Sequence, residues 1–127
     1  RKIAGEGGRV ALISGGELTV TIRGKGRGGP NQEYALALAL ALQGAAGITG
    51  FSADTDGTDG GRGDPSDPAG AFVDPTTLAR AQAMGLDARD FLDRNDSTGF
   101  FEALGDLHIS GPTLTNANDL RLLLIGD

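Results

Sequence analysis

The chain has 127 residues, a formal net charge of −6 and no cysteine. The acidic balance and the lack of a basic tail argue against nucleic acid as a partner, and the absence of cysteine excludes disulfides and thiol catalysis. No apolar run approaches the ~18 residues of a membrane span and no signal peptide is visible, so we expect a soluble, cytoplasmic protein without a membrane partner. The length predicts a single domain over residues 1–127.

The first two predicted elements are strands. Residues 9–14 (RVALIS) form a short apolar run, which indicates a buried strand. Residues 17–23 alternate strictly, with Leu18, Val20 and Ile22 on one face and polar side chains on the other. This alternation, with β-branched residues, is typical of a half-buried strand.

A helix is predicted over residues 30–43 (PNQEYALALALALQ). The alternating leucines mimic the period of a strand, but alanine and leucine are strong helix formers and no residue in the run is β-branched. Pro30 suits the first helical position, and Gly44 suits the position after the last turn. Because leucine and alanine occupy every side, we expect a helix buried against a sheet on all sides, with Leu36, Leu38, Leu40 and Leu42 all largely buried.

The remaining elements alternate between strands and helices. Strands are predicted at residues 48–53, 107–109 and 120–125, and helices at 75–84, at 87–94 and from the capping residues 95–97 to residue 104. This order predicts an α/β layered fold with a largely buried sheet.

A glycine loop (Gly24, Lys25, Gly26, Arg27, Gly28 and Gly29) lies between the alternating strand and the helix. Glycines allow close approach to the main chain, and the N–H groups at a helix start attract anions. With two cations in the loop, the predicted ligand is a phosphate or a carboxylate. The alternative is a tight turn whose two cations are only solvated. The loop also matches G-x-G-x-x-G, with Asp54 after the next strand, so a dinucleotide-binding fold remains a second interpretation.

An acidic loop follows the strand at 48–53, with aspartates at positions 54, 56, 59, 64 and 67. Carboxylates at a strand end can hold Mg²⁺ or take a proton from a hydroxyl. We therefore treat Asp54 and Asp56 as candidate functional groups that face the same cleft as Arg27, although turn formation explains them equally well. We expect the later aspartates to serve turn formation and solubility, with Asp64 and Asp67 in solvent.

Two further loops and one histidine are weaker candidates. Residues 110–119 are rich in short hydrogen-bonding side chains, which turn formation explains equally well. Residues 14–17 form a turn in which Glu17 could point into the same cleft. His108 is the only histidine and there is no cysteine, so we expect a histidine satisfied within a strand and no zinc site.

Taken in order, five segments resemble the MOFRL domain, the C-terminal part of the glycerate 2-kinase family, whose members are sometimes labelled hydroxypyruvate reductases. The segments are SGGELTVTIRGKGRGGPNQEYALALALAL, SADTDGTDG, AGAFVD, NDSTGFFEALGDL and SGPTLTNANDLRLLLI. They cover almost the whole chain from about Val10 onward. Pro30 stands where the family commonly has arginine, and Leu114 where it usually has glycine.

The resemblance implies a layered α/β/α domain with a mixed sheet and a role in ATP-dependent phosphorylation of glycerate, with Mg²⁺ bridging the nucleotide phosphates. It implies that this chain, which begins with Arg1 rather than Met, is a fragment lacking a Rossmann-like N-terminal domain across the cleft. It would place Arg27, Asp54 and Asp56 in catalysis. The substrate- or phosphate-binding residues would be the glycine loop, Asn31, Gln32, Glu33, Thr115, Asn116 and Asp119.

Three interpretations remain open from the sequence. The first is a glycerate kinase domain, inactive when isolated, in which Arg27 binds either a phosphate or the glycerate carboxylate. The second is a reductase that uses NAD(P). The third is a non-catalytic domain that serves mainly as fold or homodimer surface.

Overall fold

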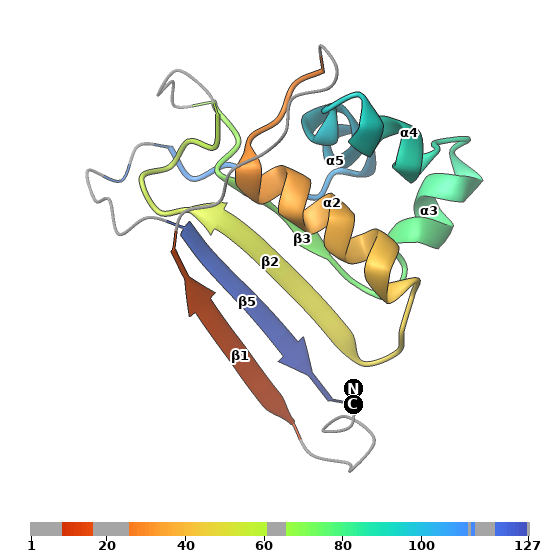
Figure 1. Ribbon diagram of the computed structural model, residues 1–127, viewed down its shortest axis with the longest axis horizontal. Helices are drawn as coiled ribbons and strands as arrows, with labels where there is room; N and C mark the ends of the chain where they lie inside the picture. The colour runs from red at the N-terminus through yellow and green to blue at the C-terminus, as the bar shows by residue number, and fades with distance from the viewer. Residues whose placement is uncertain (1–8, 17–25, 61–65, 112, 114–118, 127) are drawn as a thin grey trace.

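The computed structural model describes residues 9–16, 26–60, 66–111, 113 and 119–126. Five strands form one sheet in the order β1-β5-β2-β3-β4 (Figure 1). Their bounds are β1 Val10–Gly15, β2 Ile48–Asp54, β3 Gly70–Val73, β4 Leu107–His108 and β5 Asp119–Ile125. The predicted α/β class is confirmed, but the sheet is not mixed: each described pair of neighbouring strands runs antiparallel.

Helix α2 covers β2 and β3, and three shorter helices pack beside it (Figure 1). The helices are α2 Pro30–Leu42, α3 Thr77–Ala83, α4 Ala88–Asp93 and α5 Ser97–Leu104. Leu36, Val73 and the edge-to-face pair Phe100 and Phe101 lie in a single core cluster that joins these helices to β3. The described helices therefore lie on one face of the sheet, which gives two layers here instead of the expected three.

The helix predicted at residues 30–43 is confirmed, but its burial is more one-sided than expected. Leu36 is fully buried and Ala39 belongs to the core, whereas Leu38, Leu40 and Leu42 are only partly buried and Ala37 and Ala41 are exposed. The helix ends where Gln43 adopts a left-handed conformation at φ 47°. One side of α2 faces the core and the other does not, so the expectation of a helix buried on all sides is wrong, although all four leucines are buried or partly buried.

Strand β1 is exposed, although its apolar sequence predicted a buried strand. Leu12 is 45% exposed and Ile13 is 70% exposed, because β1 pairs only with β5 among the described strands. Strand β3 was not predicted at all. Its four residues include a glycine and an alanine, and pairing with β2 holds them in place. The strand predicted at residues 17–23 lies outside the described residues. The other predicted helices and strands occur close to their predicted positions.

The second face of the sheet carries no helix among the described residues, and its side chains are mostly apolar. The register places Ile13 and Leu122 side by side, and Phe72 and Leu124 lie on the same face. Phe51 packs against Phe72 at 4.7 Å between ring centroids and against His108 at 5.2 Å. His108 is therefore a strand histidine in an aromatic cluster, as predicted. We call this surface the open face.

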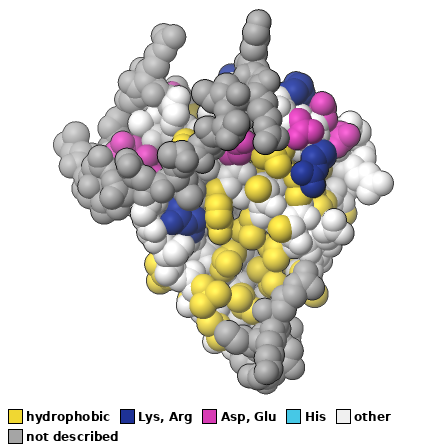
Figure 2. Space-filling view, viewed as in Figure 1, with side chains coloured by type: hydrophobic (Ala, Val, Ile, Leu, Met, Phe, Trp, Pro, Cys, Tyr) yellow, Lys and Arg dark blue, Asp and Glu magenta, His cyan; other side chains and the backbone are white. Residues whose placement is uncertain are grey.

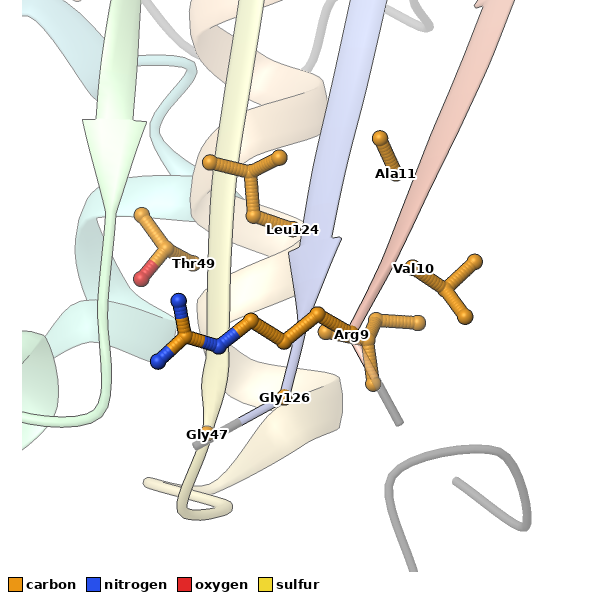
Figure 3. Close-up of a pocket in the computed structure, with 8 residues that line it drawn as sticks. Arg9, Val10, Ala11, Gly47, Thr49, Leu124 and Gly126 are labelled. Carbon is orange, nitrogen blue, oxygen red and sulfur yellow. The ribbon is translucent and has the colours of Figure 1, made fainter. Parts of the chain in front are cut away.

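A hollow of about 530 Å³ lies at one end of the sheet. Figure 3 shows Arg9 stretched across it, with the guanidinium pointing toward Thr49 and with Leu124 nearby. In Figure 2, hydrophobic side chains gather over the lower half of the molecule, and most charged side chains lie above them, toward the start of α2. On the side of the molecule shown in Figure 2, hydrophobic and charged side chains are therefore largely separated.

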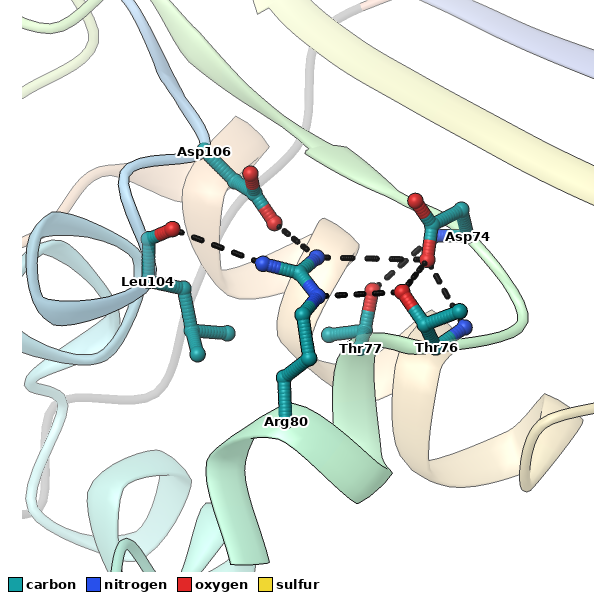
Figure 4. Close-up of polar contacts among 6 residues, drawn as sticks. All are labelled: Asp74, Thr76, Thr77, Arg80, Leu104 and Asp106. Atoms are coloured by element: carbon teal, nitrogen blue, oxygen red, sulfur yellow. Dashed lines mark hydrogen bonds and ion pairs between the residues drawn. The ribbon is translucent and has the colours of Figure 1, made fainter. Parts of the chain in front are cut away.

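Arg80 joins α3 to its surroundings (Figure 4). Its guanidinium donates to the carboxylate of Asp106 at 2.6 Å and to the hydroxyl of Thr76 at 3.0 Å. Asp74 accepts hydrogen bonds from the backbone N–H and the hydroxyl of Thr76. These contacts fix α3 between the end of β3 and the turn before β4. Among the described helices, none has the length and apolarity needed to cross a membrane.

Candidate functional site

A cavity of about 670 Å³ lies where the described end of the glycine loop, the acidic loop and α5 meet. Its polar lining includes Arg27, Asp59, Asp67 and Glu102, together with Gln32 and Thr98. The cavity is adjacent to the start of α2, where the sequence predicted an anion site.

The described part of the glycine loop is held against α5 by backbone contacts. The N–H of Gly26 donates to the carbonyl of Arg94 at 3.0 Å, and the N–H of Arg27 donates to the Asp96 carboxylate at 3.1 Å. The carbonyl of Arg27 accepts from the N–H of Thr98 at 2.9 Å. The Arg27 backbone is therefore fixed on both sides, which determines where its side chain emerges.

The glycines of this loop are needed for packing within the protein itself. A Cβ at Gly26 would overlap Asp96, one at Gly28 would overlap the hydroxyl of Ser97, and one at Gly29 would overlap the carbonyl of Asp59. These close approaches account for three glycines without any ligand. The G-x-G-x-x-G pattern therefore gives no independent support for a dinucleotide site.

The start of α2 already holds an anion, the carboxylate of Asp59. One of its oxygens accepts the N–H of Asn31 at 3.0 Å, and the other accepts the N–H of Gln32 at 2.8 Å. Gly29, at the cap position, has no side chain to do this. The side-chain amides of Asn31 and Gln32 donate to the same carboxylate at 3.2 Å and 3.0 Å. Burial raises the pKa of Asp59 and these hydrogen bonds lower it, with burial the larger effect.

Asn31 and Gln32 lie behind the surface, at 0% and 1% exposure. Asn31 donates to the carboxylate of Asp119 at 2.7 Å and accepts from the hydroxyl of Ser52 at 2.6 Å. Gln32 accepts from the hydroxyl of Thr98. Their hydrogen-bonding groups are used within the protein, so any contribution they make to ligand binding is through positioning.

The side chain of Arg27 is 63% exposed at the cavity, and Glu102 is its partner there, with 2.9 Å between nitrogen and oxygen. The hydrogen bond and the charge of Glu102 raise the pKa of Arg27, so the guanidinium stays charged. Because both side chains reach water, the pair is weakly held. A ligand anion can therefore compete with Glu102 for Arg27.

Asp54 and Asp56 are not among the described residues that line this cavity. Instead, Asp59 and Asp67 line it, and Asp67 accepts a hydrogen bond from Thr58 at 3.0 Å. The expectation that Asp67 lies in solvent while Asp54 and Asp56 share a cleft with Arg27 therefore does not hold for the described lining. Asp54 ends β2 opposite Asp119. Burial raises its pKa to about 6, and the nearby carboxylates of Asp56 and Asp119 add to this.

The other predicted site residues fall into two groups. Glu33 is partly buried and its carboxylate accepts from the amide of Asn95 at 3.1 Å and 3.2 Å. Gly24, Lys25, Glu17, Asp64, Thr115 and Asn116 lie outside the described residues. Within the described ranges, no group of three histidine, aspartate or glutamate side chains is arranged to hold a metal ion.

Asp59, Thr98 and Glu102 are the site residues that sequence reasoning missed. Asp59 was expected to serve only turn formation and solubility, yet it is 3% exposed and caps a helix that begins 29 residues earlier in the chain. No local pattern links these positions. Only the fold brings the acidic loop to the start of α2.

Sequence comparison matches residues 10–119 to the MOFRL family. D-glycerate 2-kinase of Thermotoga maritima is 50% identical over 91% of this chain, which corresponds to 27% of that protein. Glycerate kinase of Homo sapiens is 43% identical over 93% of this chain and 23% of its own length. A relative from Agrobacterium vitis, with a provisional hydroxypyruvate reductase name, is 50% identical over 94% of this chain and 30% of its own length.

The fold is also similar to a solved structure. The crystal structure of glycerate kinase from Thermotoga maritima matches with a TM-score of 0.84 and covers 91% of this chain. This chain covers 27% of that structure. The chain therefore spans less than a third of the length of these relatives.

Proposed function

This chain belongs to the MOFRL family, and we propose that it is the C-terminal domain of a longer, cytoplasmic enzyme that phosphorylates glycerate with ATP. The main support is the 50% identity and the TM-score of 0.84 to a glycerate kinase. The relatives extend far beyond the matched region, so the proposal includes a Rossmann-like N-terminal domain that forms the other wall of the cleft.

Within this proposal, Arg27 binds the carboxylate of glycerate. The described cavity lining contains one cation, Arg27, beside the carboxylates of Asp59, Asp67 and Glu102. A single guanidinium in acidic surroundings suits a monoanion, which it can bind through two parallel hydrogen bonds. The carboxylate of Glu102 pairs with Arg27 until the substrate carboxylate displaces Glu102.

The described lining does not fit a nucleotide. A triphosphate carries several negative charges, and the three carboxylates would repel it. The backbone N–H groups of Asn31 and Gln32, which a phosphate could use at a helix start, already bind Asp59. We therefore assign ATP and Mg²⁺ to polypeptide beyond these residues.

Asp54 does not line the cavity that contains Arg27, so the proposal gives it no contact with the glycerate bound there. Burial raises its pKa to about 6 at the end of β2, beside the carboxylates of Asp56 and Asp119. Asp56 donates its backbone N–H to Asp54 at 3.2 Å and holds the carboxylate at the end of β2.

The open face supports the proposal of a missing domain. Ile13, Phe72 and Leu124 are 70%, 44% and 50% exposed, and Arg9 is the charged side chain that lies beside Leu124 at one end of this face. Exposed apolar surface of this extent is typical of an interaction site. We propose that the rest of the longer polypeptide packs here and supplies the third layer.

The test uses the full-length protein, with D-glycerate and ATP–Mg²⁺, and follows ADP release. Arg27→Ala should lower kcat/KM for glycerate by about 10²-fold, the scale of losing a preorganised charged donor. Arg89→Ala, an exposed arginine on α4, is the control and should leave it unchanged. The effect should vanish with glycerol, which lacks the carboxylate. Wild-type turnover of glycerate by Arg27→Ala would refute the assignment.

The reductase alternative is tested in the same preparation. Hydroxypyruvate-dependent oxidation of NADH or NADPH, without glycerate-dependent ADP release, would replace the kinase proposal with a reductase. Neither activity in the full-length protein would favour the non-catalytic interpretation.

A further inference from the structure

The buried carboxylate of Asp59 lies at the end of the α2 helix dipole, where the glycine-loop pattern predicts a ligand phosphate. Its four hydrogen bonds come from the backbone and side-chain N–H groups of Asn31 and Gln32, between 2.8 and 3.2 Å. At 3% exposure it is not accessible as a proton donor or acceptor for a substrate. A charged group so enclosed and so fully bonded suits a positioning role rather than a chemical one.

A chain of contacts connects Asp59 to Arg27. Gln32 donates to the carboxylate and carbonyl of Asp59 and accepts from the hydroxyl of Thr98. The backbone N–H of Thr98 in turn donates to the carbonyl of Arg27 at 2.9 Å. Asp59 thus holds the segment of α5 on which the Arg27 backbone rests.

A second path runs through the backbone. Gly29 packs so closely on the carbonyl of Asp59 that no Cβ would fit, and a Cβ on Gly60 would lie 2.9 Å from Gly29. The N–H of Asp59 donates to the carbonyl of Pro68 at 2.9 Å, which anchors the acidic loop. Two residues after Arg27, the glycine loop is therefore clamped between α2 and the acidic loop.

We propose that Asp59 is a positioning residue whose carboxylate fills the anion site at the start of α2 and thereby directs the substrate carboxylate to Arg27. This inference rests on the proposed function. The sequence of the glycine loop is typical of a phosphate-binding loop. The proposal explains why Arg27 faces the cavity, whereas the N–H groups at the start of α2 bind Asp59 and not a ligand. It predicts that removing the carboxylate has two effects: the glycine loop loses its clamp, and the helix start becomes an anion site.

The test compares three variants in the full-length protein. Asp59→Asn keeps the volume but loses the charge, and its NH₂ group meets N–H donors. Asp59→Ala loses both and leaves room for a small carboxylate. Val73→Ala, in the core and away from the cavity lining, serves as a control for destabilisation alone.

Asp59→Asn and Asp59→Ala should raise the KM for glycerate by about tenfold or more, since a displaced binding group is costly, while the KM for ATP stays near wild type. Acetate should lower the KM of Asp59→Ala for glycerate toward the wild-type value, because it can bind at the helix start. It should not do so for Asp59→Asn, whose amide fills the space. If Asp59→Asn matches Val73→Ala in both KM values at equal thermal stability, Asp59 has only a structural role and the proposal is overturned.

A second measurement separates this inference from the proposed function. Amide hydrogen exchange across residues 26–32 should become faster in Asp59→Ala and should slow again with acetate, whether or not the enzyme phosphorylates glycerate. If Asp59→Ala does not fold, Thr98→Val breaks the next contact toward Arg27 and should raise the KM for glycerate alone. Unchanged exchange in Asp59→Ala, or an unchanged KM in Thr98→Val, would overturn the inference even if wild type is an active kinase.

Discussion

The guanidinium of Arg27 lies 2.9 Å from the carboxylate of Glu102, across 75 residues of sequence, and both side chains reach water at the mouth of the cavity. The backbone of Arg27 is held by Asp96 and Thr98, whereas its side chain has only this exposed ion pair among the contacts described above. Arg27 is therefore a fixed residue with an exchangeable partner, which is suited to binding an anion.

Removing the charge of Glu102 should make Arg27 a better anion receptor. In the full-length protein, Glu102→Gln should lower the KM for glycerate several-fold. Stability should change by no more than about 1 kcal/mol, because exposed pairs contribute little. Steady-state kinetics and thermal unfolding measure the two effects. A raised KM for glycerate would instead mean that Glu102 orients Arg27 for binding.

Gly29→Ala should disrupt the site more than an alanine at an open turn. A Cβ at Gly29 would overlap Asp59, whereas one at Gly105 meets nothing within 4 Å and only suffers the left-handed backbone at φ +77°. Gly105→Ala should therefore cost about 1 kcal/mol, the usual penalty for alanine in that conformation, and Gly29→Ala clearly more. Urea unfolding of both variants tests this. Equal losses would contradict the close packing of the loop.

Burial should decide how much the apolar side chains of Leu36 and Ile13 contribute to stability. Leu36→Ala removes a side chain with 0% exposure and should cost about 2–5 kcal/mol. Ile13→Ala on β1, where the side chain is 70% exposed, should cost far less in the isolated chain. In the full-length protein the cost at Ile13 should rise if the open face is covered. An equal, small cost in both contexts would show that it stays exposed.

Asp54 should make the fold less stable as the pH rises. Burial raises its pKa to about 6, above the ordinary value of about 4. The folded state therefore holds more protons than the unfolded state between these pH values, and its stability falls across that range. Asp54→Asn should gain stability relative to wild type as the pH goes from 4 to 7. Thermal unfolding of both proteins across this pH range tests the prediction. A stability difference between Asp54→Asn and wild type that does not change with pH would contradict it.

Asp74 should show the opposite pH dependence. The hydroxyl of Thr76 lowers the pKa of Asp74, with smaller contributions from the Thr76 backbone N–H and the charge of Arg80 (Figure 4). Its stabilising contribution is therefore present above the ordinary pKa and is lost as the pH falls through the lower folded value. Asp74→Asn should destabilise at pH 7, and the difference should shrink in acid. A loss that does not depend on pH would exclude the charge as its cause.

The isolated 127-residue chain should fold but should not phosphorylate glycerate. The core around Leu36, Phe100 and Phe101 supports folding, whereas in-line transfer needs groups on both sides of the phosphoryl group. Circular dichroism and ADP release test the two halves of the prediction. Turnover of about 1–100 per second, as in ordinary kinases, would show that the whole active site lies within this chain.

The sequence by itself determined the helices, the described strands other than β3, and the family. Alanine and leucine without β-branching made α2 a helix against the strand-like alternation, and Asp96 and Gly105 delimited α5. These features depend on neighbours within a few residues, so the chain order alone reveals them. The same holds for the motifs that resemble the MOFRL domain, because a family match compares residues in order.

Only the tertiary structure decided what the glycine loop does. Its glycines predicted a ligand, but Gly26 packs against Asp96 and Gly29 against Asp59. The helix start predicted a phosphate, but it binds the carboxylate of Asp59. The unpaired N–H groups at a helix N-terminus favour an anion, but whether it comes from a ligand or from the protein depends on contacts between residues that are far apart in the chain. Such contacts form only when the sheet brings the acidic loop beside α2.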